Sequence, residues 1–202
     1  ADILIGTQMI VKGHDFPNVT LVGVLAADMS LHVADYHAAE RTFQLLTQAV
    51  GRAGRGQLPG QAVIQTYDPE HFAIQTAKAQ DYESFYQHEI AYRKMMHYPP
   101  IWNMLLVHCM GKNEQITQQT AQLMADKLQS AIKRSNRPVL LVGPADATIA
   151  KVNDIYRKVL YMKAADYQTL VALKDALEQF GKKTNAFSNV TIQFDFNPSS
   201  GF

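Results

Sequence analysis

The chain of 202 residues contains a single cysteine, Cys109, so no disulfide can form within it. Such cysteine usage is typical of reducing compartments, and we expect a cytoplasmic location. No apolar run approaches the roughly 18 residues that a membrane-spanning helix needs. No signal peptide or lipidation motif is recognisable at either end. These absences predict a protein that has no membrane partner.

Two kinds of site are also missing from the sequence. The 7 histidines show neither an H-E-x-x-H motif nor a paired spacing that would hold a metal ion. No G-x-x-x-x-G-K-S/T sequence occurs, so no loop of this type is present to cradle the phosphates of a nucleotide. An acidic box that would hold Mg²⁺ is absent as well. We therefore expect no metal site in this chain, and no ATP hydrolysis by the chain alone.

Charge is distributed unevenly along the chain. The hydrophobic content of 47% is enough for one large domain or two small ones. Residues 1–99 carry 7 Lys/Arg against 10 Asp/Glu, a net charge of −3, whereas residues 100–202 carry 12 against 8, a net charge of +4. A mildly basic second half is compatible with nucleic-acid binding but does not require it.

The most informative segment is Gln48-Ala-Val-Gly-Arg-Ala-Gly-Arg-Gly56. The run Ala38–Ala53 predicts an amphipathic helix whose polar face carries Arg41, Gln44, Gln48, Arg52 and Arg55. Guanidinium groups are always charged and fork-shaped, so they suit the oxygens of a transferring phosphoryl group. The glycines inside the segment indicate that its backbone approaches a ligand closely. A basic helix end exposed to solvent is the alternative interpretation.

A polar loop between two apolar runs precedes this helix. The short run that begins at Ile3 and the run Leu21–Ala27 predict buried strands of a parallel sheet. The connection between them carries Thr7, Gln8, Lys12, Gly13 and Asp15. Because ligands of such sheets lie beyond the carboxyl ends of the strands, the loop is a candidate binding segment. Taken alone, it could equally be a loop that only turns the chain.

Residues 61–100 predict a strand followed by two helices, at Gln61–Thr66, Pro69–Lys78 and Asp81–Met96. The aromatic residues of the last helix recur at near-helical spacing. This favours a packing helix between two domains over an aromatic platform for nucleic acid. Pro99 and Pro100 end the helix.

The second half of the chain predicts the element order β-α-β-β-α-β, which is the ferredoxin-like arrangement. The expected elements are Met104–Met110, Glu114–Ile132, Val139–Val142, Ile155–Lys163, Tyr167–Phe180 and a strand from Val190 to Phe196. Gly181 is expected to stop the last helix. No catalytic constellation is visible in this half, which favours a binding module.

Together these segments resemble motifs V and VI of superfamily 2 helicases, and in particular the PriA family of replication-restart helicases. The motif V wording is Gly6-Thr-Gln-Met-x-x-Lys-Gly-x-Asp-Phe-Pro17, and that of motif VI is Leu45-Leu-Thr-Gln-x-x-Gly-Arg-Ala-Gly-Arg-Gly56. The C-terminal region of the family is matched by Tyr98-Pro-Pro100, Val142-Gly-Pro144 and Tyr156-Arg-Lys158. The resemblance therefore covers essentially the whole chain. The stretches Ala26–Met29 and Phe194–Pro198 depart from the family pattern.

The resemblance implies roles in ATP hydrolysis for the residues of the two motifs. Arg55 would be the arginine finger, Arg52 would contact the γ-phosphate, and Gln48 would place phosphate or the attacking water. Gly13 and Asp15 would lie near the nucleotide. Thr7, Gln8 and Lys12 would contact a DNA backbone phosphate.

In the C-terminal half, the candidates for contact with DNA phosphate or an acidic protein tail are Lys151, Arg157 and Lys158. Arg157 and Lys158 are neighbours in a predicted strand and so should point to opposite faces of it. Strand charges that are merely solvated are the alternative.

The resemblance also implies an α/β architecture in three parts. Residues 1–67 would be the end of a RecA-like helicase lobe 2, residues 68–100 a helical linker, and residues 101–202 a smaller α+β ferredoxin-like domain. ATP and Mg²⁺ would bind the full-length protein, whose P-loop would lie on a preceding lobe. The zinc of the family would be bound outside this chain. The implied partners are branched and single-stranded DNA, the single-stranded DNA-binding protein SSB and other primosome proteins.

The implied function is a part of an ATP-dependent 3′-to-5′ DNA helicase that restarts stalled replication forks. One alternative is a non-catalytic DNA or protein adaptor that retains a helicase-like lobe, and another is a different superfamily 2 translocase. The intact arginines and glutamine of motif VI favour the helicase, because an adaptor does not need them.

Overall fold

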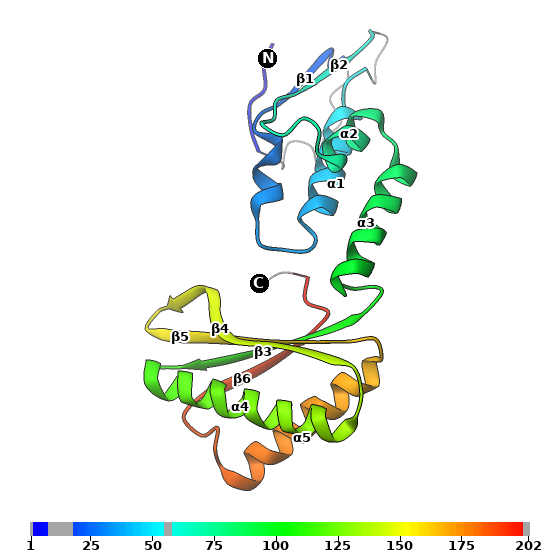
Figure 1. The fold of residues 1–202 in the computed structure, drawn as a ribbon. Coiled ribbons are helices and arrows are strands. Elements are labelled where there is room, and N and C mark those ends of the chain that lie inside the picture. Colours follow the sequence, from blue (N-terminus) through cyan, green and yellow to red (C-terminus); the bar gives the residue numbers. More distant parts are fainter. Residues whose placement is uncertain (1, 8–17, 55–57, 200–202) are drawn as a thin grey trace. The chain divides into compact units, whose positions relative to one another are not determined.

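The structure is a computed structural model that describes residues 2–7, 18–54 and 58–199. Two compact units make up the chain, an N-terminal unit (Ala1–Tyr92) and a C-terminal unit (Arg93–Phe202). Figure 1 shows the elements of both units. The structure combines a parallel sheet of two strands with an antiparallel sheet of four. This confirms a mixed α/β protein.

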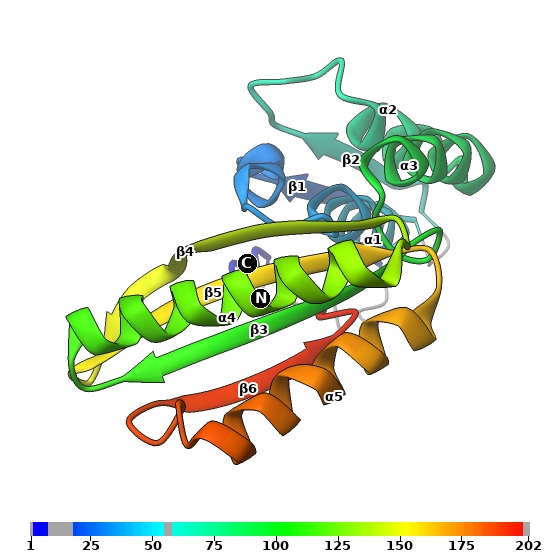
Figure 2. The same cartoon turned by 60° about the horizontal axis from the view of Figure 1, so that its bottom comes forward.

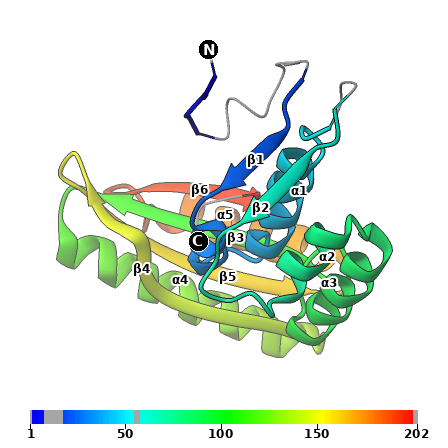
Figure 3. The ribbon, with the colours of Figure 1, turned by 90° about the horizontal axis from the view of Figure 1, so that it is seen from above.

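The N-terminal unit is built on a parallel pair of strands, β1 (Leu21–Val24) and β2 (Gln61–Ile64). The two lie side by side in Figure 3, with Leu21 opposite Gln61 and Val24 opposite Ile64. Its other elements are the 3₁₀ helix η2 (Ala27–His32), α1 (Ala38–Val50), α2 (Phe72–Ala79) and most of α3 (Tyr82–Met96). The strands predicted at Leu21–Ala27 and Gln61–Thr66 are therefore confirmed, and they pair in parallel with each other.

Two details of these strands differ from the prediction. The strand predicted from Ile3 is wrong, because residues 2–7 form no regular secondary structure and Ile3 and Ile5 are exposed. An apolar run becomes a strand only where another strand pairs with it, and the described part of the chain supplies none here. Full burial of the pair is also wrong, since Leu21 is 60% and Val63 50% exposed.

The core of the N-terminal unit lies where its three α-helices meet. Phe43 of α1 stacks on Phe85 of α3 with ring centroids 4.2 Å apart. Ala73, Ile74 and Ala77 of α2 complete this core, together with Leu46 and Ala27. Residues 68–100, predicted as a linker, thus contribute buried side chains here. The division of the chain at 1–67, 68–100 and 101–202 stays a prediction.

The C-terminal unit is an antiparallel sheet with the strand order β4-β5-β3-β6. Its elements are β3 (Asn103–Gly111), α4 (Glu114–Ser135), β4 (Val139–Val152), β5 (Ile155–Ala164), α5 (Tyr167–Thr184) and β6 (Thr191–Phe196). Both helices cover the same face of the sheet (Figure 2). The predicted order β-α-β-β-α-β is confirmed.

Sequence periodicity explains the core of this unit. Alternate residues of β3, namely Leu105, Val107 and Cys109, join the buried stripes of α4 and α5. Asn113 and Asp166 cap the two helices by accepting hydrogen bonds from the backbone N–H of Ile116 and Gln168.

Two predicted boundaries are corrected. Strand β4 continues to Val152 through two irregularities of register, the first beside Gly143, whose φ is +107°. Helix α5 passes through Gly181 and ends at Thr184, before Asn185 in the left-handed conformation. The Phe187 ring occupies the space that a Cβ at Gly181 would need, so this glycine serves packing rather than helix termination.

The single cysteine supplies a test of this core. Cys109 is fully buried, and burial raises the pKa of its thiol to about 11. We expect a disulfide reagent at about pH 8, where an ordinary thiol is partly ionised, to leave the folded protein unlabelled. One thiol per chain should react after unfolding in urea. The absorbance of the released reagent measures the labelling. Rapid labelling of the native protein would contradict the buried position of Cys109.

Candidate nucleotide and DNA site

The polar face of α1 is the centre of the candidate site. Arg41, Gln44 and Gln48 recur on one side of the helix and are all exposed, while Phe43 and Leu46 are buried on the other. This division follows from the helical period and confirms the amphipathic pattern of the sequence. Gln48 therefore stands in the last turn of α1, open to a ligand.

Arg52 lies just beyond the helix rather than on it. Helix α1 ends at Val50, three residues before the predicted end at Ala53. The chain continues in a tighter turn, in which the N–H of Arg52 donates to Ala49 and that of Ala53 to Val50. The predicted helical face shared by Gln48 and Arg52 is thus wrong, because Gln48 lies in the last turn of α1 and Arg52 in the turn after it.

Glycines allow this turn to pack against the start of β2. The N–H of Gly54 donates to the carbonyl of Val19 at 2.9 Å, and its φ is +76°. A Cβ at Gly54 would come within 2.9 Å of the Gly60 nitrogen, and a Cβ at Gly60 would overlap the backbone of Gly54. The close approach that the sequence predicts for a ligand is made, at Gly54, by the chain itself.

The other residues predicted for this site are only partly described. Gln8, Lys12, Gly13, Asp15 and Arg55 lie outside the described residues. Thr7 is exposed and belongs to no helix or strand. The structure therefore describes Gln48 in the last turn of α1 and Arg52 in the turn after it. The roles of all the candidate residues stay predictions.

A polar cluster at the other end of α1 was not predicted from the sequence. Asp35 lies in the loop before the helix, and its side chain is only 5% exposed. One carboxylate oxygen accepts a hydrogen bond from Arg41 at 2.6 Å, and the other accepts one from the backbone of His37 at 2.9 Å. The signal available in the sequence was an aspartate six residues before an arginine, which alone does not predict contact.

Asp28 is a second buried carboxylate, situated in η2 beyond the carboxyl end of β1. Burial raises the pKa of this carboxyl, but hydrogen bonds from its own backbone N–H, from the backbone of Tyr67 and from the Thr66 side chain outweigh burial. The result is a lowered pKa, to which His32 at 3.8 Å also contributes. Asp28 therefore ties η2 to the segment that follows β2.

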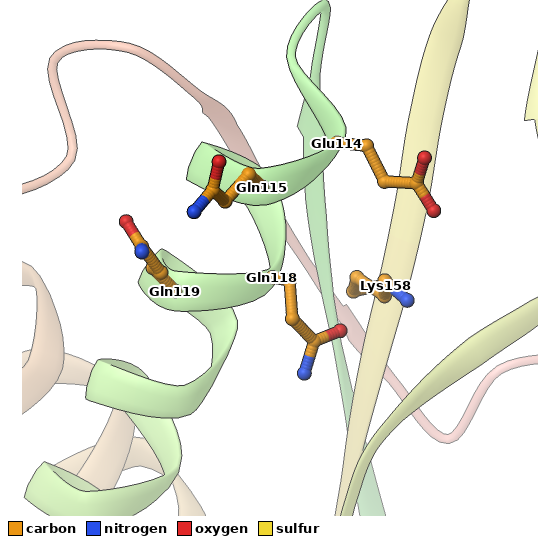
Figure 4. Close-up of a pocket in the computed structure, with 5 residues that line it drawn as sticks. All are labelled: Glu114, Gln115, Gln118, Gln119 and Lys158. Atoms are coloured by element: carbon orange, nitrogen blue, oxygen red, sulfur yellow. The ribbon is translucent and has the colours of Figure 1, made fainter.

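In the C-terminal unit, Arg157 and Lys158 point to opposite faces of β5, as predicted. Lys158 is paired with Cys109, which faces the helices, whereas Arg157 is paired with Met110. Lys158 is 12% exposed and forms an ion pair with Asp146 at 2.6 Å. It also lines a shallow hollow together with Glu114, Gln115, Gln118 and Gln119 of α4 (Figure 4).

The other two basic candidates have different surroundings. Lys151 forms an ion pair with Asp154 at 2.9 Å, and its Nζ lies 4.9 Å from the centre of the Tyr156 ring. Arg157 lies near His108, and burial together with the Arg157 charge lowers the pKa of that imidazole. His108 is therefore uncharged at neutral pH, and Arg157 provides the positive charge at this part of the helix-free face.

Within residues 2–7, 18–54 and 58–199, no group of three or more His, Cys, Asp or Glu side chains is placed to hold a metal ion. Over the same ranges, every helix is too short or too polar to cross a membrane.

Comparison with known proteins places the chain in a family. The model of the primosomal protein N C-terminal domain matches residues 94–199. Curated relatives named replication restart protein PriA come from Bacillus subtilis (45% identity over 98% of this chain), Synechocystis (40% over 99%) and Chlamydia muridarum (39% over 100%). The chain belongs to the primosomal protein N family, whose relatives carry the name PriA. It spans 24%, 23% and 26% of the length of these three relatives.

The lowered pKa of Asp28 predicts a pH-dependent contribution to stability. A carboxyl with a pKa lower in the folded than in the unfolded state stabilises the fold above its unfolded pKa, and this contribution is lost as the pH falls. We expect Asp28→Asn to lower the urea midpoint at neutral pH, and the difference from wild type to shrink below about pH 4. Asp68→Asn, at an exposed position, is the control. A difference independent of pH would refute the ionic origin.

Proposed function

We propose that this chain is part of an ATP-dependent 3′-to-5′ DNA helicase that acts in replication restart. Its N-terminal unit would be the end of a RecA-like second helicase lobe, and its C-terminal unit a DNA- and protein-binding domain. The observation that carries this proposal is the exposed polar face of α1. That face leads directly into the turn of Arg52, beside a parallel strand pair, in a member of the primosomal protein N family.

The chemistry of this helix end suits the phosphates of ATP. The amide of Gln48 and the guanidinium of Arg52 are hydrogen-bond donors, as phosphate oxygens require. Arg55 follows three residues after Arg52 and is assigned the role of arginine finger. In that role its fixed positive charge would stabilise negative charge on the transferring phosphoryl group. Gly13 and Asp15 are assigned to the nucleotide, and Thr7, Gln8 and Lys12 to the DNA backbone.

The remaining parts of such an enzyme are assigned to the rest of the polypeptide. When bound, ATP would supply the phosphoryl group and Mg²⁺ would neutralise its charge. Gln48 and Arg52 provide no carboxylate for Mg²⁺, and the chain has no P-loop sequence. We assign the carboxylate that would hold Mg²⁺ and the P-loop to a preceding lobe, because the relatives are about four times as long as this chain. The isolated chain would then not hydrolyse ATP.

The C-terminal unit is assigned to contacts with branched or single-stranded DNA and with SSB or other primosome proteins. Residues 100–202 carry a net charge of +4, with 12 Lys/Arg against 8 Asp/Glu. Among the three basic candidates, Arg157 lies on the helix-free face, whereas Lys151 and Lys158 are each held by an aspartate. A phosphate would have to compete with these carboxylates.

Substitution of Arg55, the assigned arginine finger, tests the proposed ATPase activity. We expect Arg55→Ala in the full-length protein to lower DNA-stimulated ATP hydrolysis on the order of 10³-fold, with affinity for forked DNA nearly unchanged. Steady-state ATPase and DNA-binding assays measure the two properties. Lys78→Ala removes the same charge from an exposed position of α2 and serves as the control. A wild-type rate in Arg55→Ala would remove the assignment, and absence of turnover in wild type would favour an adaptor.

The basic candidates predict a change in salt dependence. We expect the double variant Lys151→Ala, Arg157→Ala to bind forked DNA more weakly. Its plot of log affinity against log salt should flatten by about 0.9 for each DNA phosphate that the variant no longer neutralises. The matched control is Lys133→Ala, Lys182→Ala, which removes two exposed charges from α4 and α5. Equal affinities and slopes for the two double variants would leave Lys151 and Arg157 as solvated strand charges.

A further inference from the structure

We propose that Asp35 and Arg41 form a positioning clip at the start of α1. The clip holds the helix so that Gln48, in its last turn, and Arg52, in the turn beyond it, are presented together to phosphate. Neither Asp35 nor Arg41 is assigned contact with the ligand. The proposal rests on the proposed ATPase function and adds two positioning residues to it.

Asp35 uses all of its oxygens to hold the first turn of α1. Its backbone carbonyl accepts from the N–H of Ala38 at 3.0 Å. Its carboxylate accepts from the backbone of His37 at 2.9 Å and from the guanidinium of Arg41 at 2.6 Å. The His37 ring nitrogen lies 3.1 Å from the same carboxylate. One loop residue is thus bonded to positions 37, 38 and 41.

These bonds replace a missing helix cap. The N-cap residue of α1 is His37, whose side chain makes no capping hydrogen bond. The first N–H groups of a helix have no partner within the helix, and a negative charge near them is favourable. Asp35 supplies that charge from a nearly buried position, where hydrogen bonds between charged groups are short and strong.

The clip acts on the same face of α1 that carries Gln48. Arg41 and Gln48 are seven residues apart, which places them on one side of α1, about 10 Å apart along its axis. The opposite side of the helix is fixed independently, by Phe43 and Leu46 in the core and by a 2.7 Å hydrogen bond between Thr42 and Ser30. Loss of the clip should therefore loosen the orientation of the polar face without unfolding the unit.

Asp35→Asn and Arg41→Lys are the variants that test the clip in the full-length protein. Asp35→Asn keeps the shape and an acceptor for His37 but removes the charge opposite Arg41. Arg41→Lys keeps the charge but loses the forked donor. We expect kcat for DNA-stimulated ATP hydrolysis to fall by roughly ten- to a hundredfold, as for small misplacements of catalytic groups. KM for ATP and the melting temperature should remain close to wild type.

Combining the two substitutions separates a clip from two independent effects. Because both break one interaction, the double variant should lose no more kcat than the more affected single variant. Asp68→Asn is the control and should leave kcat unchanged. Wild-type kcat in both single variants would overturn the clip, and so would a loss of kcat explained by a lowered melting temperature. Absence of DNA-stimulated turnover in wild type would instead refute the proposed function itself.

Discussion

The contact between Gly54 and Gly60 is the constraint on which the candidate site depends. After α1 the chain must turn back and enter β2, and it does so with two backbones closer than any side chain would permit. Gly54 donates to Val19, and Gln61 donates to Thr20, so the turn is fastened to the residues just before β1. The position of Arg52 follows from this fastening and from the helix that precedes it.

The two units use their sheets differently. In the C-terminal unit, four antiparallel strands bury one face under α4 and α5, and alternate residues of β3 contribute to that core. In the N-terminal unit, the two strands only partly bury alternate residues, and a sheet of two strands contributes little stability by itself. The fold of the N-terminal unit therefore depends on helix packing, above all on the stacking of Phe43 on Phe85 and on the buried Ala73 and Ala77 of α2.

The spacing of apolar residues predicted which face of a helix is buried better than it predicted where the helix ends. The start of α1 at Ala38 and its buried Phe43 and Leu46 follow from the pattern of apolar residues. Its end at Val50 does not, because contacts of Gly54 with distant residues make the turn favourable. Gly181 shows the converse, since a residue that commonly ends helices lies inside α5 and makes room for Phe187. Boundaries depend on tertiary contacts that a local pattern does not contain.

The same distinction applies to the candidate site. Gln48 was predicted on an exposed helical face, and its exposure follows from the helical period alone. The role of Asp35 could not be predicted, because a loop aspartate can hold the start of a helix only when the fold brings its carboxylate there. Motif recognition selects residues that meet a ligand. It passes over those that hold such residues in place, because their contacts are with the protein itself.

Charge pairing then decides how the basic residues of the C-terminal unit can act. An ammonium already bonded to a carboxylate gains less from a phosphate, because the new contact must replace the old one. Lys158, mostly buried and paired with Asp146, would have to break that pair and leave the Asp146 carboxylate beside the same anion. Lys151 is more exposed, but Asp154 holds it in the same way. Arg157 has an uncharged His108 as its neighbour. A phosphate bound at this part of the helix-free face would therefore contact the charge of Arg157, and His108 would add no second positive charge.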